Sequence, residues 1–282
     1  MTVTDVNVVK SAIFERPDDA NKGTLGSLLC VCGSYGMAGA AVMSAKGALR
    51  TGIGLAKCAL PRSIYPIVAQ TILESVYYPL SENADGRISK VNVPFLVSES
   101  CKSSATLVGC GLGVCDDTLK IVFSFIENST TPLVLDADAL NCVAKQPEIL
   151  LRKKAPIIIT PHPGEMSRLT GLATPLVNAE RERVALDFAQ KYGVVTVLKG
   201  AGTVIASPNG KVLVNPTGNS GMATGGSGDV LAGMTASILA QGASAFSSAA
   251  AAVYLHGLAG DIAAEKYLSL IHISEPTRHS LI

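Results

Sequence analysis

The segment at residues 215–234, NPTGNSGMATGGSGDVLAGM, combines several glycines with a single acidic residue, Asp229. Gly225, Gly226 and Gly228 let the backbone turn its amides toward one point. The apolar residues after Asp229 predict a helix that begins there, and the free amides of a helix N-terminus bind phosphate and stabilise a phosphoryl group during its transfer. Asp229 would then accept a proton beside that group. The alternative is that Asp229 only caps the helix.

Other polar residues follow predicted strands, where the carboxyl ends of a parallel sheet bind ligands. In ITPHPGE, the prolines on both sides of His162 predict a rigid, non-helical loop that presents His162 and Glu165. In LDADALN, one of Asp136 and Asp138 could bind a ligand or magnesium while the other caps a helix. Lys199 follows a strand in LKGAGT. Each residue, taken alone, could instead have only a structural role. His162 could be a hydrogen-bonded structural histidine, one of the aspartates could cap a helix, and Lys199 could be a solvent-exposed charge.

The rest of the chain supplies elements that can position these groups. Short β-branched runs alternate with helical patterns, which predicts a mainly parallel sheet with helices on both faces. A Pro-Asn-Gly turn predicts a hairpin, and hence an antiparallel sheet edge, near residues 203–215. We expect one domain over residues 1–267, with the last helix ending near Tyr267. Residues 268–282 do not continue the pattern and resemble a cloning or sequencing artefact. The predicted strands lie within 28–33, 54–61, 105–113, 132–141, 156–165 and 194–216, and the clearest helices within 38–52, 116–128 and 179–193.

Composition excludes several classes of protein. The 282 residues are 48% hydrophobic, and their net charge of +1 gives no basic surface for nucleic acid or an anionic membrane. The N-terminus lacks the apolar core of a secretory signal, and residues 230–260 are interrupted by glycine and serine, which favours two packed helices over a membrane span. Seven cysteines without a CxxC pair indicate neither a disulfide framework nor a cysteine/histidine zinc site. These features predict a reduced, cytoplasmic protein.

Familiar catalytic motifs do not fit. The chain has no GxxxxGK[ST], GxSxG or HExxH motif, no protein-kinase motif set, and no correctly spaced GxGxxG. The glycine–aspartate loop therefore has to be interpreted with its companions.

Taken together and in order, six stretches resemble the ADP/ATP-dependent NAD(P)H-hydrate dehydratase family of the ribokinase-like superfamily. GGSGD alone indicates the superfamily, whereas PHPGEM and GSxGMxGAA select the dehydratases. The resemblance covers roughly residues 25–267 and implies a ribokinase-like α/β/α fold. The stretches are GSYGMAGAAVMSAKGALRTGIGL, VGCGLG, LVLDADALN, ITPHPGEMSRLTG, VLKGAGTVIA and NPTGNSGMATGGSGDVLAGM.

The resemblance implies a hydro-lyase that repairs (S)-NADHX and (S)-NADPHX, the hydrated forms of NADH and NADPH. A nucleotide with Mg2+, ADP more readily than ATP, would phosphorylate the 6-hydroxyl, and phosphate would then leave. This route is chemically reasonable because hydroxide is a poor leaving group and phosphate is a good one.

The resemblance also implies site residues, matched position by position. Asp229 would be the catalytic base and contact the hydrate. Glu165 would support magnesium through water. The remaining matches are the anion hole at Gly226, Ser227 and Gly228, the nucleotide contacts at Lys199, Gly200, Ala201, Gly202, Thr203 and Gly228, and the hydrate contacts at Ala40, Gly111 and His162.

Two departures and two alternatives accompany the resemblance. Cys110 stands where the family commonly has proline, which would loosen that turn, and the unusual tail replaces the family's C-terminal element. Too few residues precede Gly26 for an epimerase domain, so we expect a separate NAD(P)HX epimerase as a functional partner, and a homo-oligomer, commonly a tetramer. The alternatives are a vitamin-precursor kinase of the hydroxymethylpyrimidine or hydroxyethylthiazole type and a non-catalytic nucleotide sensor.

Overall fold

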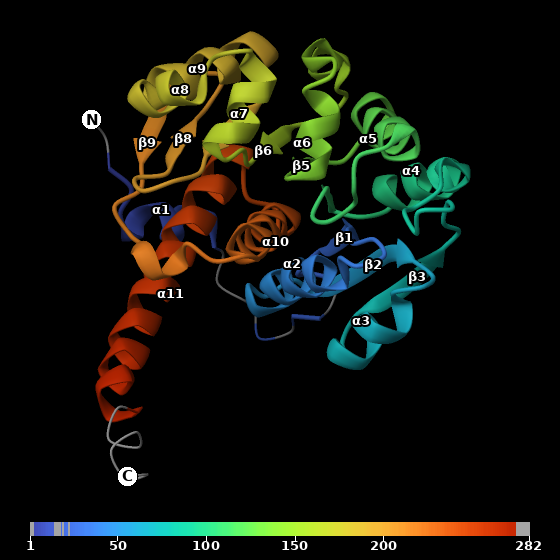
Figure 1. Cartoon of the computed structure of the whole chain (residues 1–282), viewed down its shortest axis with the longest axis horizontal. Coiled ribbons are helices and arrows are strands. Elements are labelled where there is room, and N and C mark those ends of the chain that lie inside the picture. The colour runs from blue at the N-terminus through green and yellow to red at the C-terminus, as the bar shows by residue number, and fades with distance from the viewer. Residues whose placement is uncertain (1–2, 14–17, 19, 22, 275–282) are drawn as a thin grey trace, which may run out of the picture.

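The structure is a computed structural model that describes residues 3–13, 18, 20–21 and 23–274, which form one sheet between two layers of helices (Figure 1). The sheet confirms the predicted α/β/α class. Its nine strands, in their order across the sheet, are β3 (Val76–Leu80), β2 (Leu55–Pro61), β1 (Ser27–Val31), β4 (Ala105–Val108), β5 (Leu133–Leu135), β6 (Ile157–Ile159), β7 (Val195–Leu198), β8 (Val204–Ala206) and β9 (Val212–Val214).

All neighbouring strands from β3 to β7 pair in parallel, as their continuous apolar runs predict. The last two pairings, β7 with β8 and β8 with β9, are antiparallel. The turn between β8 and β9 is closed by the amide of Ser207, which donates to the carbonyl of Lys211 at 2.9 Å, and Gly210 supplies the positive φ of 87°. The hairpin and the sheet edge are therefore confirmed.

The helices divide between the two faces of the sheet. One face is covered by α1 (Val6–Ala12), α2 (Ala38–Arg50), α3 (Tyr65–Thr71), α10 (Ser227–Ala240) and α11 (Ala245–Ser274). The other is covered by α4 (Val93–Cys101), α5 (Asp116–Asn128), α6 (Asp138–Val143), α7 (Pro163–Thr170), α8 (Thr174–Ala179) and α9 (Arg181–Tyr192). Short 3-10 helices, η1 (Lys90–Asn92), η2 (Pro147–Arg152) and η3 (Ser220–Met222), lie in the connections.

The direction in which strands are added reverses between β1 and β4. From β1 the chain moves outward to β2 and β3, then returns to β4 and continues the other way. The loops after β1 and β4 therefore leave the same edge of the sheet toward opposite faces, and the crevice between them is where open α/β sheets bind ligands. Here the two loops are tied together, because the amide of Gly33 donates to the carbonyl of Cys110 at 2.8 Å.

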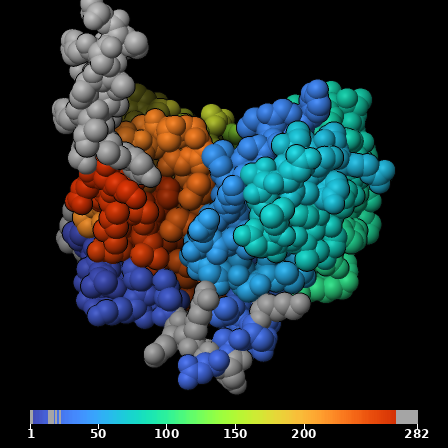
Figure 2. Space-filling model, turned by 90° about the horizontal axis from the view of Figure 1, so that it is seen from below, coloured from blue at the N-terminus to red at the C-terminus, as the bar shows by residue number. Residues whose placement is uncertain are grey.

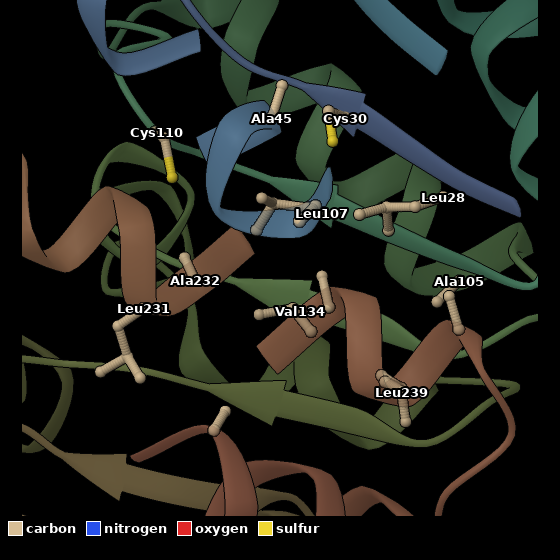
Figure 3. Packing of buried hydrophobic residues seen from close by; sticks show 14 of the residues in the cluster. Leu28, Cys30, Ala45, Ala105, Leu107, Cys110, Val134, Leu231, Ala232 and Leu239 are labelled. Atoms are coloured by element: carbon tan, nitrogen blue, oxygen red, sulfur yellow. The ribbon is translucent and has the colours of Figure 1, made fainter. Parts of the chain in front are cut away.

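Two apolar cores, one on each face, hold the layers to the sheet. Alternate residues of the same strand point into different cores, so that Leu28 belongs to one and Leu29 to the other, and both are completely buried. Figure 3 shows Leu107 and Val134 of neighbouring strands in the core that α10 covers. In the same view, Ala105 and Leu239 lie at one end of this core, and Cys110 and Leu231 lie at the other.

The helices α2 and α10 approach to backbone contact. A Cβ on Gly47 would lie 2.7 Å from the carbonyl oxygen of Val230, and a Cβ on Gly233 would overlap the carbonyl of Ser44. Only glycine permits this separation. The contact fixes the start of α10 relative to the loop after β1.

The two ends of the described chain meet on one side of the molecule. The dark-blue helix α1 lies against the red helix α11 (Figure 2). The amide of Thr4 donates to the carbonyl of Val214 at 3.0 Å, so the N-terminal segment also covers the β9 edge. Helix α11 extends away from the body (Figure 1) and continues to Ser274, so the predicted end near Tyr267 is wrong.

Local structure contradicts one further expectation, and it shows elements that were not predicted. Pro163 does not bar a helix: it occupies the first position of α7, where its missing N–H costs nothing. The helices α1, α3 and α4 and the edge strand β3 were not predicted, and Pro79 obscured the strand pattern of β3.

All seven cysteines are free thiols in the structure. Within the part of the chain that the structure describes, no helix has the length and apolar character needed to cross a membrane.

Candidate active site

The start of α10 carries the glycine–aspartate motif. Gly226 is the N-cap residue with φ of 92°, and Asp229 is the third residue of the helix. No side chain caps this helix, so the alternative that Asp229 merely serves as the cap is wrong. The carboxylate instead lies beside the positive end of the helix dipole.

Several amides at this helix start are available to a ligand. Those of Gly226, Gly228 and Asp229 donate to no group among the described residues. A side chain at Gly226 would overlap the sulfur of Met43, and a Cβ at Gly228 would lie 3.3 Å from the Nζ atom of Lys199. The glycines therefore keep the helix start open and let a cation lie directly beside it, which suits an anionic group.

Lys199, which is itself partly exposed, forms an ion pair with the buried Asp136 at the carboxyl ends of β7 and β5. Its Nζ atom donates to Oδ1 of Asp136 at 2.7 Å and lies 3.9 Å from Oε2 of Glu165. Thr160 completes the network by donating from Oγ1 to Oδ1 of Asp136 at 2.8 Å. Burial alone would lower the pKa of Lys199, but the two carboxylates outweigh it and raise the pKa, so the ammonium stays charged. The alternative that Lys199 is a solvated charge is therefore wrong, because its ammonium is paired with Asp136.

His162 and Glu165 form a reciprocal cap at the start of α7. Nδ1 of His162 accepts from the amides of Gly164 at 3.0 Å and Glu165 at 3.3 Å, while Oε2 of Glu165 accepts from the His162 amide at 2.8 Å. Because Nδ1 accepts twice, the proton of the neutral ring lies on Nε2. Nε2 lies 3.4 Å from Oε1 of Glu165, and half of the His162 side chain is exposed, so a ligand can also approach this N–H.

Burial and charge perturb both groups. Burial raises the pKa of Glu165 to about 7, although Lys199 opposes the shift. Burial lowers the pKa of His162, and the charges of Lys199 and Arg168 lower it further, so the imidazole is neutral near pH 7.

Asp229, Asp136 and Glu165 are the carboxylates of one cluster around Lys199, and Asp229 is the least constrained of the three. It is half-buried, and ligand atoms of Cys110, Asp136 and Asp229 all lie within 4.8 Å of one another. Burial raises the pKa of Asp229 to about 6, and the neighbouring charge of Asp136 acts in the same direction. A carboxylate with this pKa can accept a proton near neutral pH and is a suitable general base.

The expected hydrate contacts Ala40 and Gly111 meet in the crevice between β1 and β4. A Cβ on Gly111, whose φ is 65°, would lie 2.7 Å from the Cβ atom of Ala40. Ser34 holds the turn by donating from Oγ to the Gly111 carbonyl at 2.8 Å. Gly113 lies elsewhere in the turn and donates to Oδ2 of Asp138 at 2.8 Å, so Asp138 anchors this loop rather than capping α6.

The expected nucleotide run divides into two parts. Lys199 points inward, whereas Gly200, Ala201 and Gly202 form an exposed turn closed by the hydroxyl of Thr203, which donates to the Gly200 carbonyl at 2.9 Å. A groove of about 460 Å³ beside this turn is lined by Ala201 and Gly202 but not by Lys199 or Asp229. The structure therefore brings Lys199, Gly228, His162 and Glu165 around the cluster and leaves the tip of the run on the outside.

Some residues of the site were missed or only half recognised from sequence. Asp136 was noted as a strand-end residue but not as the partner of Lys199. Oγ of Ser227 lies 3.5 Å from Nε2 of His256, a residue of α11 that no local pattern connects with the glycine loop. Arg181 donates from Nη2 to the Leu198 carbonyl at 2.8 Å and lies against the turn at Gly200.

The reversed sheet, its two helical layers and the glycine-led start of α10 define a ribokinase-like α/β protein. In agreement, the chain superposes on a ribokinase-like superfamily protein from Enterococcus faecalis V583 with a TM-score of 0.81 and 26% identity, over 94% of this chain and 88% of that one.

The chain belongs to the NAD(P)H-hydrate dehydratase family, whose sequence profile matches residues 28–276. A crystal structure of the ADP/ATP-dependent NAD(P)H-hydrate dehydratase from Bacillus subtilis, co-crystallized with ATP/Mg2+, is similar with a TM-score of 0.77 and 31% identity, over 91% of this chain and 87% of that one. The bifunctional NAD(P)H-hydrate repair enzyme of Thermofilum pendens is 41% identical over 251 residues, which are 89% of this chain and 48% of that protein. The chain thus spans about half the length of this relative and of several others.

Proposed function

We propose that the protein catalyses nucleotide-dependent dehydration of (S)-NADHX and (S)-NADPHX to NADH and NADPH. The observation that carries the proposal is Asp229, a half-buried carboxylate with a raised pKa in the first turn of α10, beside amides that donate to no described group. Family membership supports the substrate class. The Bacillus subtilis enzyme is ADP/ATP-dependent, which supports either nucleotide as co-substrate, and we favour ADP.

Each part of the reaction has a residue suited to it. Asp229 accepts the proton of the substrate's 6-hydroxyl as its oxygen attacks the terminal phosphorus of the nucleotide. The helix start at Gly226, Ser227 and Gly228 stabilises the charge on the transferring phosphoryl group. The lone pair of the ring nitrogen then expels phosphate from C6, and loss of a ring proton restores the dihydropyridine.

Binding roles follow from the same positions. The run from Lys199 through Gly200, Ala201, Gly202 and Thr203, together with Gly228, would hold the nucleotide. Ala40 and Gly111 would form a closely packed wall for the hydrate, and the Nε2–H of neutral His162 would donate to one of its oxygens. Asp229 would contact the same substrate.

Magnesium would be supported indirectly. Both oxygens of Glu165 face partners in its own cap, Oε2 toward the His162 amide at 2.8 Å and Oε1 toward Nε2 of His162 at 3.4 Å. This buried carboxyl therefore fits a water-mediated role better than direct coordination. When bound, the ion would neutralise phosphate charge.

Wider expectations belong to the same proposal. We propose a single catalytic domain over residues 1–267 and a tail over residues 268–282, of which the family profile covers the part up to residue 276. We also propose a homo-oligomer such as a tetramer, a cytoplasmic location, and no nucleic-acid or membrane partner. An NAD(P)HX epimerase activity would supply the S epimer. The bifunctional name of the Thermofilum pendens relative supports a functional link between the two activities.

The direct test incubates the protein with (S)-NADHX, Mg2+ and either ADP or ATP and follows the absorbance of the dihydronicotinamide ring. We expect nucleotide-dependent recovery of NADH, with one nucleotide consumed per NADH formed. A stable phosphorylated product from a vitamin precursor would favour the kinase alternative. Tight nucleotide binding without turnover of any hydrate would favour the sensor.

A further inference from the structure

We infer that Cys110, Asp136 and Asp229 form a binding site for a thiophilic divalent cation such as Zn2+ or Cd2+, distinct from the Mg2+ that accompanies the nucleotide. The three residues come from different elements: the turn after β4, the end of β5 and the first turn of α10. Their ligand atoms lie within 4.8 Å of one another.

The spacing suits a tetrahedral ion. Sγ of Cys110 lies 3.8 Å from Oδ2 of Asp136. A zinc ion with its usual sulfur and oxygen bond lengths separates two such ligands by about 3.6 Å. The ligand atom of Asp229 lies within 4.8 Å of the other two, so a shift of this half-buried side chain by about 1 Å would bring it to the same separation.

The lone pairs that a metal needs are available. Oδ1 of Asp136 is occupied by Lys199 and Thr160, whereas Oδ2 interacts only with the Cys110 thiol among the described groups. The Asp229 carboxylate interacts with the same thiol. Binding a metal in place of the thiol proton therefore breaks only these weak sulfur interactions and leaves the Lys199 pair intact.

Charge also favours a divalent ion. The cluster holds the cation of Lys199 and the carboxylates of Asp136 and Asp229, and metal binding converts the Cys110 thiol to a thiolate. Three negative charges then balance the ammonium and the divalent ion. The thiol proton passes to solvent as the hydrated ion loses water to the protein ligands, so binding tightens as pH rises.

The donor set selects against magnesium. A thiolate is a soft ligand, whereas Mg2+ prefers oxygen and retains its water. A second thiol, Cys32, contacts Cys110 and makes the surroundings softer. Cys110 and Asp136 are fully buried, whereas Asp229 is half-buried, so Asp229 is the ligand through which an ion would enter. Figure 3 shows Cys110 at the end of the core near Leu231, in the first turns of α10.

One consequence rests on the proposed function: an ion that holds Asp229 prevents it from accepting a proton, so Cd2+ would inhibit dehydration over the concentration range in which it occupies the site. The metal site itself does not depend on that function. Binding and inhibition are therefore measured separately.

The binding test titrates Cd2+ into protein in which the accessible thiols are removed, Cys101→Ser with Cys115→Ser, in the presence of excess Mg2+. We expect one equivalent to produce an ultraviolet sulfur-to-cadmium charge-transfer band. Adding Cys110→Ser should abolish the band. The matched control is Cys142→Ser, which removes another fully buried thiol outside the cluster and should leave the band unchanged.

A second variant, at Asp229, tests the metal site without changing the Cys110 thiol that produces the absorbance band. Asp229→Asn should weaken Cd2+ binding by at least the roughly 10-fold to 100-fold typical of perturbing a metal site, while a band remains at high Cd2+. A band that survives Cys110→Ser, or an affinity unchanged by Asp229→Asn, would overturn the site. Tight binding without inhibition would leave the site intact and count against Asp229 as the base.

Discussion

Asp136 and Asp229 lie within one small cluster, yet the protein treats them differently. Asp136 follows a buried strand, is 1% exposed, and is held by Lys199 and Thr160. Asp229 lies in the first turn of a helix and is half-buried, and among the described residues its hydrogen-bond donor is the weak thiol of Cys110. Fixed charges can therefore hold one carboxylate, Asp136, while a neighbouring carboxylate, Asp229, is still able to exchange a proton.

The difference has a physical origin in the elements. A strand end surrounded by neighbouring strands can place partners on several sides of a carboxylate. A helix start offers backbone amides, but here glycines replace the side chains that would cap it. Asp136 therefore organises the site, and Asp229 is available for chemistry.

The largest expected effect is on turnover in Asp229→Asn. Loss of a general base should lower kcat by roughly 10²-fold to 10⁴-fold while nucleotide affinity stays unchanged, since the amides of α10 remain. Steady-state assays with isothermal titration of nucleotide measure both quantities. Undiminished turnover would remove Asp229 from the mechanism, and Asp229 would then not differ from Asp136 in function.

Removing the ion-pair partner of Asp136 should lower the stability of the fold. Lys199→Met leaves the buried Asp136 charge without its cation, which we expect to lower the free energy of unfolding by about 3–5 kcal/mol. Urea denaturation gives the value, and the exposed Lys120→Met is the control, with an expected change within about 0.5 kcal/mol. Equal effects of the two substitutions would mean that the pair is not structurally important.

The backbone at the start of α10 requires glycine at position 226 but not at position 225. Gly226→Ala should lower the free energy of unfolding by about 1–3 kcal/mol, because φ is 92° and the new methyl overlaps Met43. Gly225→Ala meets no atom within 4 Å and is the matched control. Urea denaturation of both variants measures the difference, and similar losses would contradict the assigned backbone geometry.

The smallest effect concerns the stability of Asp229→Asn. Burial raises the pKa of Asp229 from 3.8 to about 6, so folding takes up a proton between these values and the charged form destabilises the native state above pH 6. At pH 8 the Asn variant should therefore be more stable, by on the order of 1 kcal/mol after allowance for solvent screening. Below pH 4 the difference should vanish. A variant less stable than the parent at pH 8 would show that Asp229, like Asp136, is needed for the fold.

Sequence predicted a mainly parallel sheet, the edge hairpin and the start of α10 because each depends on local patterns. It predicted Lys199 and Asp229 as separate site residues. It could not predict that Lys199 pairs with Asp136, since those residues are 63 positions apart and meet only through the strand order. Nor could it predict that Pro163 starts α7, because proline both breaks helices and favours their first position.

The most direct test of the central claim is the pH dependence of single-turnover dehydration of (S)-NADHX at saturating nucleotide and Mg2+. If Asp229 accepts the proton, the rate should fall on the acid side with an apparent pKa near 6, and the slow residual reaction of Asp229→Asn should lack that limb. An acid limb that persists at the same pH in the Asn variant would assign the titration to another group and contradict the account.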